Sequence, residues 1–582
     1  MAEFTIRGEN YHWIDKAEDN VTDLCLHGHV TVAIGNTVLT GDGNVSAAAL
    51  LLLKSLTEDH TPGEIQMVPC CGHFWCPDEA LENVTIIGCD KGLDWTVAHE
   101  NGAVRLTAMD GETVFVDEYA YLEEVLRFAE NVDRYFSHCP PRLLPEDPFT
   151  RNGYAAFRNE WNRWYRAGAR TLFREFVRKG HGAAHARLEH LEDADAEDYA
   201  DILIDAMASE QRYDRQGNRD RTVYLLDLYD LFPAPEKELI LRTVLDRHMQ
   251  IDYQNMFTYA PLLKGFAGRG VTEAGEILKK LYNHYRTALE NRAQPPDGYD
   301  ELGGMVEHLA WELDIRPHSW EQPEPEKRTQ APPMTIETVI EHALNRTSSD
   351  IFHPARYRDF LCVQPPEKIA QLAEAVKTVD DPDIKVRLYS LFDVVKYPGD
   401  PAEMITLLKE RMDALKSWVA ADDDAEKQRR LGAMCLVRAL ALLHHPAVRT
   451  LALKMVEMSK RQANLRIYAL DLWCANFDEK TDVDRMMDFL EKRPSGEEYT
   501  YQCHDEDMSI LQNLYTRKYE DPRMYGIPVR IYMETYCSTC RHTAVEILAR
   551  HGMLQEGLRR QCLWDCELST RELAKEMEGK TI

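Results

Sequence analysis

Two pairs of cysteines near the end of the chain carry the most recognisable chemistry in this sequence. Two residues separate Cys537 from Cys540, and three residues separate Cys562 from Cys566. Because each pair spans about one helical turn, the four thiolates could meet one ion, as in a tetrahedral zinc site. The alternative is that these cysteines pack between the last two helices, since free cysteine is among the most buried residue types. Zinc is therefore a candidate cofactor that nothing in the sequence requires.

A second group of thiol and imidazole ligands lies in the first part of the chain. Its members are Cys70, Cys71, His73, Cys76 and Cys89, with Cys25, His27 and His29 as further candidates. So many soft ligands in a short stretch make a second metal site a candidate. The alternative is a strand over residues 74–76 whose cysteines face the core. Catalysis by a thiolate would need a base within reach and a lowered pKa, which spacing does not show.

One basic island covers residues 151–179, with eight basic residues against two glutamates. The candidate binding residues within it are Trp161, Arg163, Trp164, Arg166, Arg170 and Arg174. Arginines beside stacking aromatic rings can bind nucleic acid. The alternative is an ordinary helix whose arginines pair with acidic groups of the same chain.

The charge of the whole chain favours that alternative. Its 98 acidic residues against 68 basic ones give a formal net charge of −30, and a field of this sign repels phosphate backbones. The longest apolar run, Ala47 to Leu53, is far shorter than the ~20 residues of a membrane helix. The start of the chain has no basic segment followed by an apolar one. We therefore expect a cytoplasmic protein without membrane contact, whose cysteines are thiols or metal ligands rather than disulfides.

Changes in pattern along the chain divide it into domains. Residues 1–140 combine β-rich runs with amphipathic helices, which predicts a small α+β domain rich in cysteine and histidine. Residues 150–315 and 334–582 are almost entirely helical in pattern. Residues 316–333, rich in proline and glutamate, form a predicted linker.

Several elements inside these domains have clear local signals. We expect a hairpin over residues 30–40, with Gly-Asn as its turn, and helices over 46–56 and 119–136. The acidic runs at 422–424 and 504–507 are expected to be solvated loops between helices.

A short pattern recurs in the helical parts, in which an arginine follows the start of an amphipathic helix, often after proline. The clearest copies begin at Asp381 and His445, each followed directly by proline. Proline suits the first helical turn, where an amide hydrogen would lack a partner anyway, and aspartate can cap it. Looser copies surround Arg466, Arg541 and Arg571.

These arginines are expected to bond carbonyl or carboxylate groups of the preceding helical unit. Helix pairs that cannot bury their own apolar faces must stack on one another. The repeats therefore predict a mainly α fold, an extended α-solenoid that follows the small α+β domain.

The pattern resembles the HEAT-like repeat family, whose second helices often begin with aspartate, a valine-arginine pair and then alanine and leucine positions. The segments that carry the resemblance are residues 381–388 and 445–452, within a region of about 150–582. Their spacing departs from a regular period of ~40 residues, so the repeats are degenerate. The resemblance implies a binding scaffold for proteins, peptides or, in one branch, DNA.

Residues 1–140 resemble a domain of uncharacterised bacterial proteins. The matching segments are 23–29, 69–73 and 88–95. The same region is similar to sequences described as limonene hydroxylases. Hydroxylation would need haem, flavin or non-haem iron, and the chain shows no clear fingerprint for any of them.

Together these features predict a non-enzymatic interaction scaffold that binds a protein or peptide partner along its helical surface. We expect the basic island to receive an acidic segment of that partner. One alternative is a nucleic-acid-binding or DNA base-repair protein on the same scaffold. A further alternative is a metal-dependent or redox enzyme, including a hydroxylase, in residues 1–140.

Overall fold

The computed structural model describes residues 4–578 apart from positions 15–20, 64, 73, 89–90, 101–102, 190–194, 209–217, 293–299, 316–333, 346–354, 417–423, 460–461, 494–500 and 516. The described chain is mainly helical, and its strands all lie between Phe4 and Asp117. It divides into two compact units. Unit 1 comprises Met1–Ile315, Phe489–Tyr499 and Gly557–Ala574, and unit 2 comprises Arg316–Asp488, Thr500–Glu556 and Lys575–Ile582.

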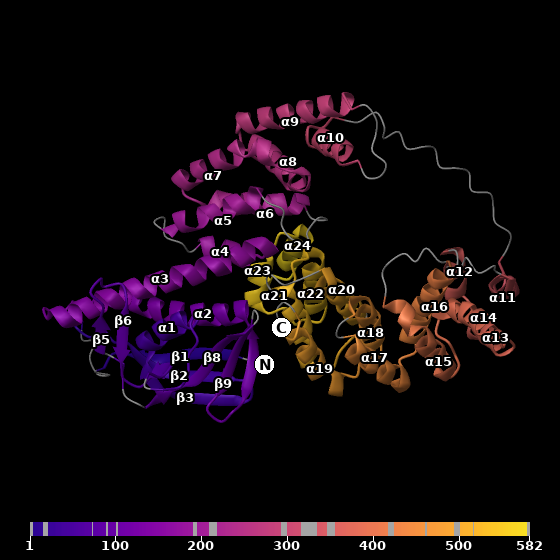
Figure 1. Ribbon diagram of the computed structural model, residues 1–582, viewed down its shortest axis with the longest axis horizontal. Coiled ribbons are helices and arrows are strands. Elements are labelled where there is room, and N and C mark those ends of the chain that lie inside the picture. Colours follow the sequence, from indigo (N-terminus) through magenta and orange to yellow (C-terminus); the bar gives the residue numbers. More distant parts are fainter. Residues whose placement is uncertain are drawn as a thin grey trace. The chain divides into compact units, whose positions relative to one another are not determined.

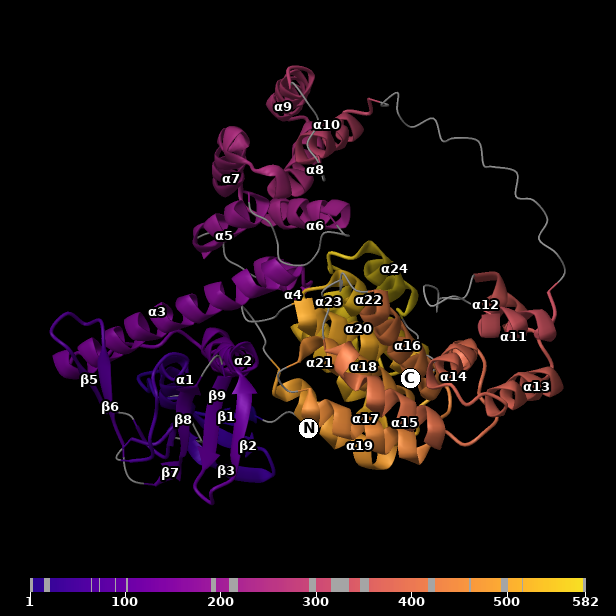
Figure 2. The same cartoon turned by 45° about the vertical axis from the view of Figure 1, so that its right-hand side comes forward.

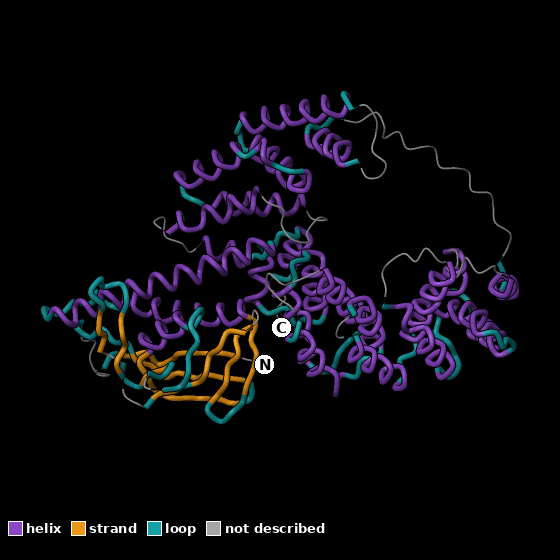
Figure 3. Tube along the Cα trace, in the orientation of Figure 1, coloured by secondary structure: helices purple, strands orange, loops and turns teal. Residues whose placement is uncertain are grey.

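Two antiparallel sheets form the beginning of unit 1 (Figures 1 and 3). The first has the strand order β1 (Phe4–His12), β2 (His27–Ile34), β3 (Thr37–Asn44), and the second has β10 (Thr113–Asp117), β9 (Ala103–Ala108), β8 (Trp95–Glu100). Two short ladders pair β4 (Val68–Pro69) with β7 (Gly92–Leu93), and β5 (Phe74–Pro77) with β6 (Val84–Ile87). Every second residue of β2 is buried, as a strand with one face on a core requires. The hairpin predicted over residues 30–40 is confirmed as β2 and β3.

Helices cover these sheets in two layers. α1 (Val45–Lys54) and α2 (Glu118–His138) contact the strands, and α3 (Pro148–Lys179) contacts both helices (Figure 2). The side chains of Asn44 and Asp117 cap α1 and α2 by accepting backbone N–H groups of the first turn, which satisfies donors that a helix leaves open. The helices predicted over 46–56 and 119–136 are thereby confirmed.

The long helix α3 joins the strand-rich part to the helices that follow it. Asp147 caps it and Pro148 occupies its first turn, whereas Gly180 ends it in the left-handed conformation with φ 71°, which glycine adopts without penalty. Phe157 of α3 stacks on Trp75 of β5 with ring centroids 4.2 Å apart. One continuous core results, so the stretches expected as separate domains at 1–140 and 150–315 form a single unit.

Seven further helices extend unit 1, and the chain then reaches Ile315, directly before the predicted linker. They are α4 (Ala183–Glu189), α5 (Glu197–Ala208), α6 (Asn218–Leu231), α7 (Ala234–Asp246), α8 (Tyr253–Gly268), α9 (Thr272–Glu290) and α10 (Glu301–Glu312). Helices two positions apart are neighbours, because α3 contacts α5, α5 contacts α7, and α4, α6 and α8 follow the same rule. The linker predicted at 316–333 lies outside the described residues.

The last helical segment of the chain, residues 557–574, belongs to unit 1 rather than to the domain expected over 334–582. It includes most of α23 (Glu556–Cys562) and α24 (Leu568–Glu576). The Cys566 amide donates to the Gly180 carbonyl over 2.8 Å, and the Trp564 ring stacks on His185 at 3.5 Å. Arg571 forms an ion pair with Asp227 over 2.6 Å. These contacts join positions more than 300 residues apart, which no local pattern encodes.

Unit 2 is built from helices alone in its described part. They are α11 (Ile336–Asn345), α12 (Ala355–Cys362), α13 (Pro366–Lys377), α14 (Pro382–Tyr389), α15 (Ala402–Arg411), α16 (Asp424–Ala441), α17 (Pro446–Met458), α18 (Ala463–Ala475), α19 (Glu479–Glu491), α20 (Tyr501–Tyr515), α21 (Gly526–Glu534) and α22 (Ser538–Arg550). Short 3₁₀ turns cover Ser390–Asp393, Met412–Leu415 and Pro522–Tyr525. α14 contacts α16, α16 contacts α18, α18 contacts α20, and α20 contacts α22.

The two clearest sequence repeats have the local structure that was predicted. Asp381 caps α14 by accepting from two backbone N–H groups, and His445 caps α17 in the same way through one. Behind the second cap, Val448, Leu451 and Met455 are buried on one face of α17, the spacing of an amphipathic helix.

The arginines of these repeats bond to both earlier and later parts of the chain. Arg466 and Arg541 donate to the carbonyls of Ser459 and Thr535, the residues that end the preceding helices α17 and α21, as the pattern predicted. Arg449 of α17 donates to both carboxylate oxygens of Asp482 in α19, with Nε–Oδ2 at 2.8 Å, and Arg466 of α18 pairs with Glu506 of α20 at 3.2 Å. The side chains of Asp482 and Glu506 are buried. Burial alone would raise the pKa of Asp482, but hydrogen bonds led by that from Arg449 outweigh it and lower the pKa.

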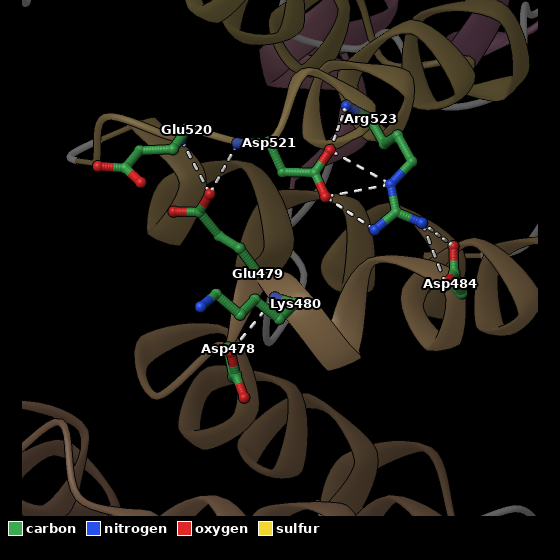
Figure 4. Close-up of polar contacts among 7 residues, drawn as sticks. All are labelled: Asp478, Glu479, Lys480, Asp484, Glu520, Asp521 and Arg523. Atoms are coloured by element: carbon green, nitrogen blue, oxygen red, sulfur yellow. Dashed lines mark hydrogen bonds and ion pairs between the residues drawn. The ribbon is translucent and has the colours of Figure 1, made fainter.

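The start of α19 also holds the chain that follows α20 (Figure 4). One carboxylate oxygen of Glu479 accepts from the backbone N–H groups of Glu520 and Asp521, at 2.9 and 3.0 Å. Arg523 then bridges Asp521 and Asp484, with its Nη1 2.9 Å from Asp484 Oδ1. These polar contacts therefore join α19 to the segment 520–523.

Replacing Asp482 with Asn should destabilise the α17–α19 region, because it leaves the Arg449 guanidinium without its buried countercharge. We expect a loss of about 3 kcal/mol in local unfolding free energy, measured as faster amide hydrogen exchange in peptides from these helices. Because the pKa of Asp482 is lowered on folding, the wild-type contribution is present above the unfolded aspartate pKa and is lost as pH falls through the folded value. Lys377→Ala, which breaks an exposed pair with Glu374, is the control and should cost less than about 1 kcal/mol.

Replacing Gly182 with Ala should release residues 557–574 from unit 1. A Cβ at this position would lie 1.8 Å from the carbonyl oxygen of Gln561. Because the clash involves backbone atoms, it cannot be relieved by moving a side chain. We expect a cost of about 1–3 kcal/mol, seen as loss of exchange protection in peptides covering 557–574. Gly268→Ala, where a Cβ meets no atom within 4 Å, is the matched control, and equal protection in the two variants would contradict the assigned docking.

Candidate functional site

A cluster of one histidine and two cysteines lies where two neighbouring helices of unit 2 begin. His504 is in the first turn of α20, Cys537 is the N-cap residue of α22, and Cys540 is in the first turn of α22. One potential ligand atom from each residue lies within 4.8 Å of the other two. Because α20 and α22 contact each other, helix packing brings the three side chains together.

Short contacts hold this cluster in place. The Cys537 sulfur accepts a hydrogen bond from the Cys540 backbone N–H over 3.5 Å, and the Cys540 sulfur lies 3.6 Å from Nδ1 of His504. Cys537 is 7% exposed and Cys540 is 2% exposed, whereas His504 is half-buried. The sulfur atoms are therefore held by rigid elements and are largely removed from water.

The three groups alter each other's proton affinity. A hydrogen bond from the Cys540 thiol has the largest effect and lowers the pKa of Cys537, burial opposes it, and a hydrogen bond from His504 lowers it further. The hydrogen bond to Cys537 raises the pKa of Cys540, and another raises the pKa of His504. The arrangement therefore favours a Cys537 thiolate beside a protonated imidazole, a form of cysteine that can act as a nucleophile or a metal ligand.

The structure places only part of the predicted zinc set in this cluster. Cys537 and Cys540 are present, but Cys562 and Cys566 belong to the segment 557–574 of unit 1. Both are buried, with 0% and 1% exposure. In the described part of the chain, the group of three contains neither of them, and the third ligand is His504 instead.

His504 was missed because residues 504–507 have the composition of a solvated loop. That expectation is wrong, since they form the first turns of α20 and both Glu506 and Asp507 are buried. The available signal was the helical spacing of apolar residues downstream, where Ile510, Leu511 and Leu514 are buried on α20. Residues 422–423 of the other acidic run lie outside the described residues.

The cysteine- and histidine-rich part of unit 1 does not assemble a comparable group among the residues that the structure describes there. Cys70 is in a disulfide bond, contrary to the expectation of thiols, whereas Cys71 and Cys76 are free and half-buried. Burial raises the pKa of Cys25 to about 12, and the nearby Asp23 charge adds to the rise. The strand of the alternative interpretation is confirmed as β5, but its core-facing residue is Trp75, whereas Cys76 is only half-buried.

The other members of this candidate group have separate surroundings. His27 contacts the Cys25 carbonyl through its Nδ1, and His29 pairs with Asp42 over 2.9 Å. His73 and Cys89 lie outside the described residues.

The basic island forms α3, and most of its candidate binding residues have partners within unit 1. Arg163 donates to the Glu82 carbonyl and to Asn83, Arg166 to Asp195 over 2.9 Å, and Arg170 to Asp201 over 2.7 Å. These contacts follow the alternative interpretation, in which the arginines pair with acidic groups of the same chain.

The aromatic residues of the island are not surface anchors. Trp161 is 3% exposed and packs against Phe157 in the core, which corrects its choice as a binding residue. Trp164 is half-buried and lies beside Arg163. Arg174 is exposed, so it remains the most available member of the set.

No family model, curated protein or solved structure matches this chain. No helix among the described residues is both long enough and apolar enough to cross a bilayer.

The cluster predicts a thiolate that persists at low pH. In reduced, chelator-treated protein, ultraviolet thiolate absorbance should remain as pH falls well below the ordinary cysteine pKa of about 8.5, because hydrogen bonds favour the charged form of Cys537. This signal should vanish in Cys537→Ser and, since the main donor is removed, titrate at higher pH in Cys540→Ala. Cys474→Ser should leave it unchanged, because burial raises the pKa of Cys474. A thiolate signal that appears only near pH 8.5 would contradict the assignment.

Proposed function

We propose that the protein is a non-enzymatic scaffold that binds a protein or peptide partner along an α-solenoid surface. The observation that carries the proposal is the packing order of unit 2, in which α14, α16, α18, α20 and α22 each contact the next. Regular contact between helices two positions apart is the arrangement of helical-repeat proteins, in which each repeat touches mainly its neighbours. Unit 1 follows a similar order from α3 to α8.

Such a stack presents the outer faces of successive helices as one broad surface. The apolar faces of successive helices are buried between neighbouring helices, as Leu451, Met455 and Leu472 illustrate. Polar links such as Arg449–Asp482 join helices within the stack. The remaining faces of consecutive helices can then contact an extended partner at several points, which is how solenoids bind.

The charge distribution favours a basic partner over nucleic acid. The chain has a net charge of −30, and three arginines of α3 already pair with groups of their own unit. An acidic surface attracts basic protein segments and repels phosphate backbones. The sequence had suggested that the basic island receives an acidic segment of a partner. The proposal here is the opposite: the partner is basic and binds acidic groups of this chain.

The proposal predicts a specific, salt-sensitive protein complex. Full-length tagged protein, cross-linked in its native host, should co-purify with a basic protein. When that basic protein carries the tag instead, it should co-purify with this chain. The purified pair should bind more weakly as salt rises, because exposed charges are screened. Asp482→Asn should reduce recovery by disturbing the helix stack, whereas the control Lys377→Ala should not.

Two results would contradict the scaffold proposal. One is recovery of nucleic acid, with gel-shift binding that falls steeply with salt and is lost in Arg174→Glu. The other is reciprocal recovery that fails under cross-linking for every candidate partner.

A further inference from the structure

We propose that His504, Cys537 and Cys540 form a binding site for a zinc-class divalent cation. The proposal does not depend on the scaffold function. It concerns a different ligand set from the four cysteines that the sequence indicated, because it replaces Cys562 and Cys566 by an imidazole.

The distances within the cluster fit a tetrahedral ion. Zinc binds cysteine sulfur at about 2.3 Å and histidine nitrogen at about 2.0–2.1 Å, so a sulfur and a nitrogen on one ion are about 3.6 Å apart. The Cys540 sulfur and Nδ1 of His504 are separated by 3.6 Å, and all three ligand atoms lie within 4.8 Å of one another. An ion can therefore be accommodated with small side-chain adjustments.

The surroundings are those of a built site rather than of a chance surface cluster. Both cysteines are more than nine-tenths buried, and each ligand is anchored in the first turn or the cap of a helix. The Cys540 amide donates to the Cys537 sulfur, a hydrogen bond that orients a thiolate ligand and offsets its charge. The ion would join α20 to α22 and thus stabilise their packing.

The donor types select the class of ion. Two thiolates and an imidazole favour zinc and similar borderline or soft metals, whereas magnesium and calcium prefer oxygen ligands. Two thiolates also neutralise a divalent charge, which a largely dry site requires. Among the described residues, the group offers three protein ligands, so the fourth position is left to water or to a group from a bound partner.

A disulfide between Cys537 and Cys540 is the main competing chemistry. A disulfide would use both sulfur atoms. The His504 nitrogen would then have no thiolate beside it. The presence of a third donor at ligand distance favours the ion, and the experiment below separates the two outcomes.

The test uses cobalt(II) as a spectroscopic substitute for zinc. Reduced, metal-free full-length protein is titrated with cobalt(II) alone. We expect one equivalent to give thiolate-to-cobalt charge-transfer bands and the intense visible bands of a tetrahedral ion, both abolished by added zinc. Cys537→Ser and Cys540→Ser should each lose at least half of the charge-transfer intensity, and His504→Ala should weaken binding at least tenfold.

Matched variants distinguish this site from its alternatives. Cys562→Ser tests the four-cysteine set and should bind cobalt as the wild type does. Cys474→Ser, which alters another buried cysteine of unit 2, controls for general effects of such a change. Loss of binding in Cys562→Ser would overturn the three-residue site in favour of the four-cysteine set.

The wild-type protein decides the matter even if a ligand variant does not fold. A wild-type cobalt spectrum without sulfur charge transfer, or no binding after full reduction, would overturn the proposal. If peptide mapping also shows a Cys537–Cys540 disulfide in protein isolated without reductant, the cluster is a redox dithiol instead.

Discussion

The structure depends on one constraint: most of the helices of unit 2 are too short to be stable alone and must bury their apolar faces against neighbours. α14 has 8 residues and α21 has 9, whereas isolated helices shorter than ~12–15 residues are marginal in water. Burying one large aliphatic side chain contributes about 1.5–3 kcal/mol. Packing of each helix on the next is therefore what makes the helices persist, and the order of the stack follows from it.

Charged groups then act mainly within the molecule. Arginines of unit 2 bind buried carboxylates of other helices, as in Arg449–Asp482 and Arg466–Glu506. Removing a charge from such a pair is costly because the other stays buried. Many of the basic residues are thus committed to internal contacts, in a chain whose formal net charge is −30.

The candidate metal site is a product of the same neighbour relation. His504 lies in the first turn of α20 and Cys537 caps α22, and these helices pack together as members of the stack. Helix starts are rigid and rich in free backbone N–H groups, which suits anionic sulfur. The proposed interaction surface and the proposed ion site would use different parts of the same helix stack. The first would use exposed helix faces, and the second uses a buried junction between α20 and α22.

Short-range signals were enough to predict the β2–β3 hairpin, helices α1 and α2, the Asp381 cap and the pairing of Cys537 with Cys540, because turns, caps and helical spacing act over a few residues. They could not show that Trp161 is buried, that His504 joins the two cysteines, or that residues 557–574 return to unit 1. Those features were decided by tertiary structure. Each depends on which apolar faces pack together. Several distant segments have faces of similar composition, so no single stretch of sequence shows which of them will be in contact.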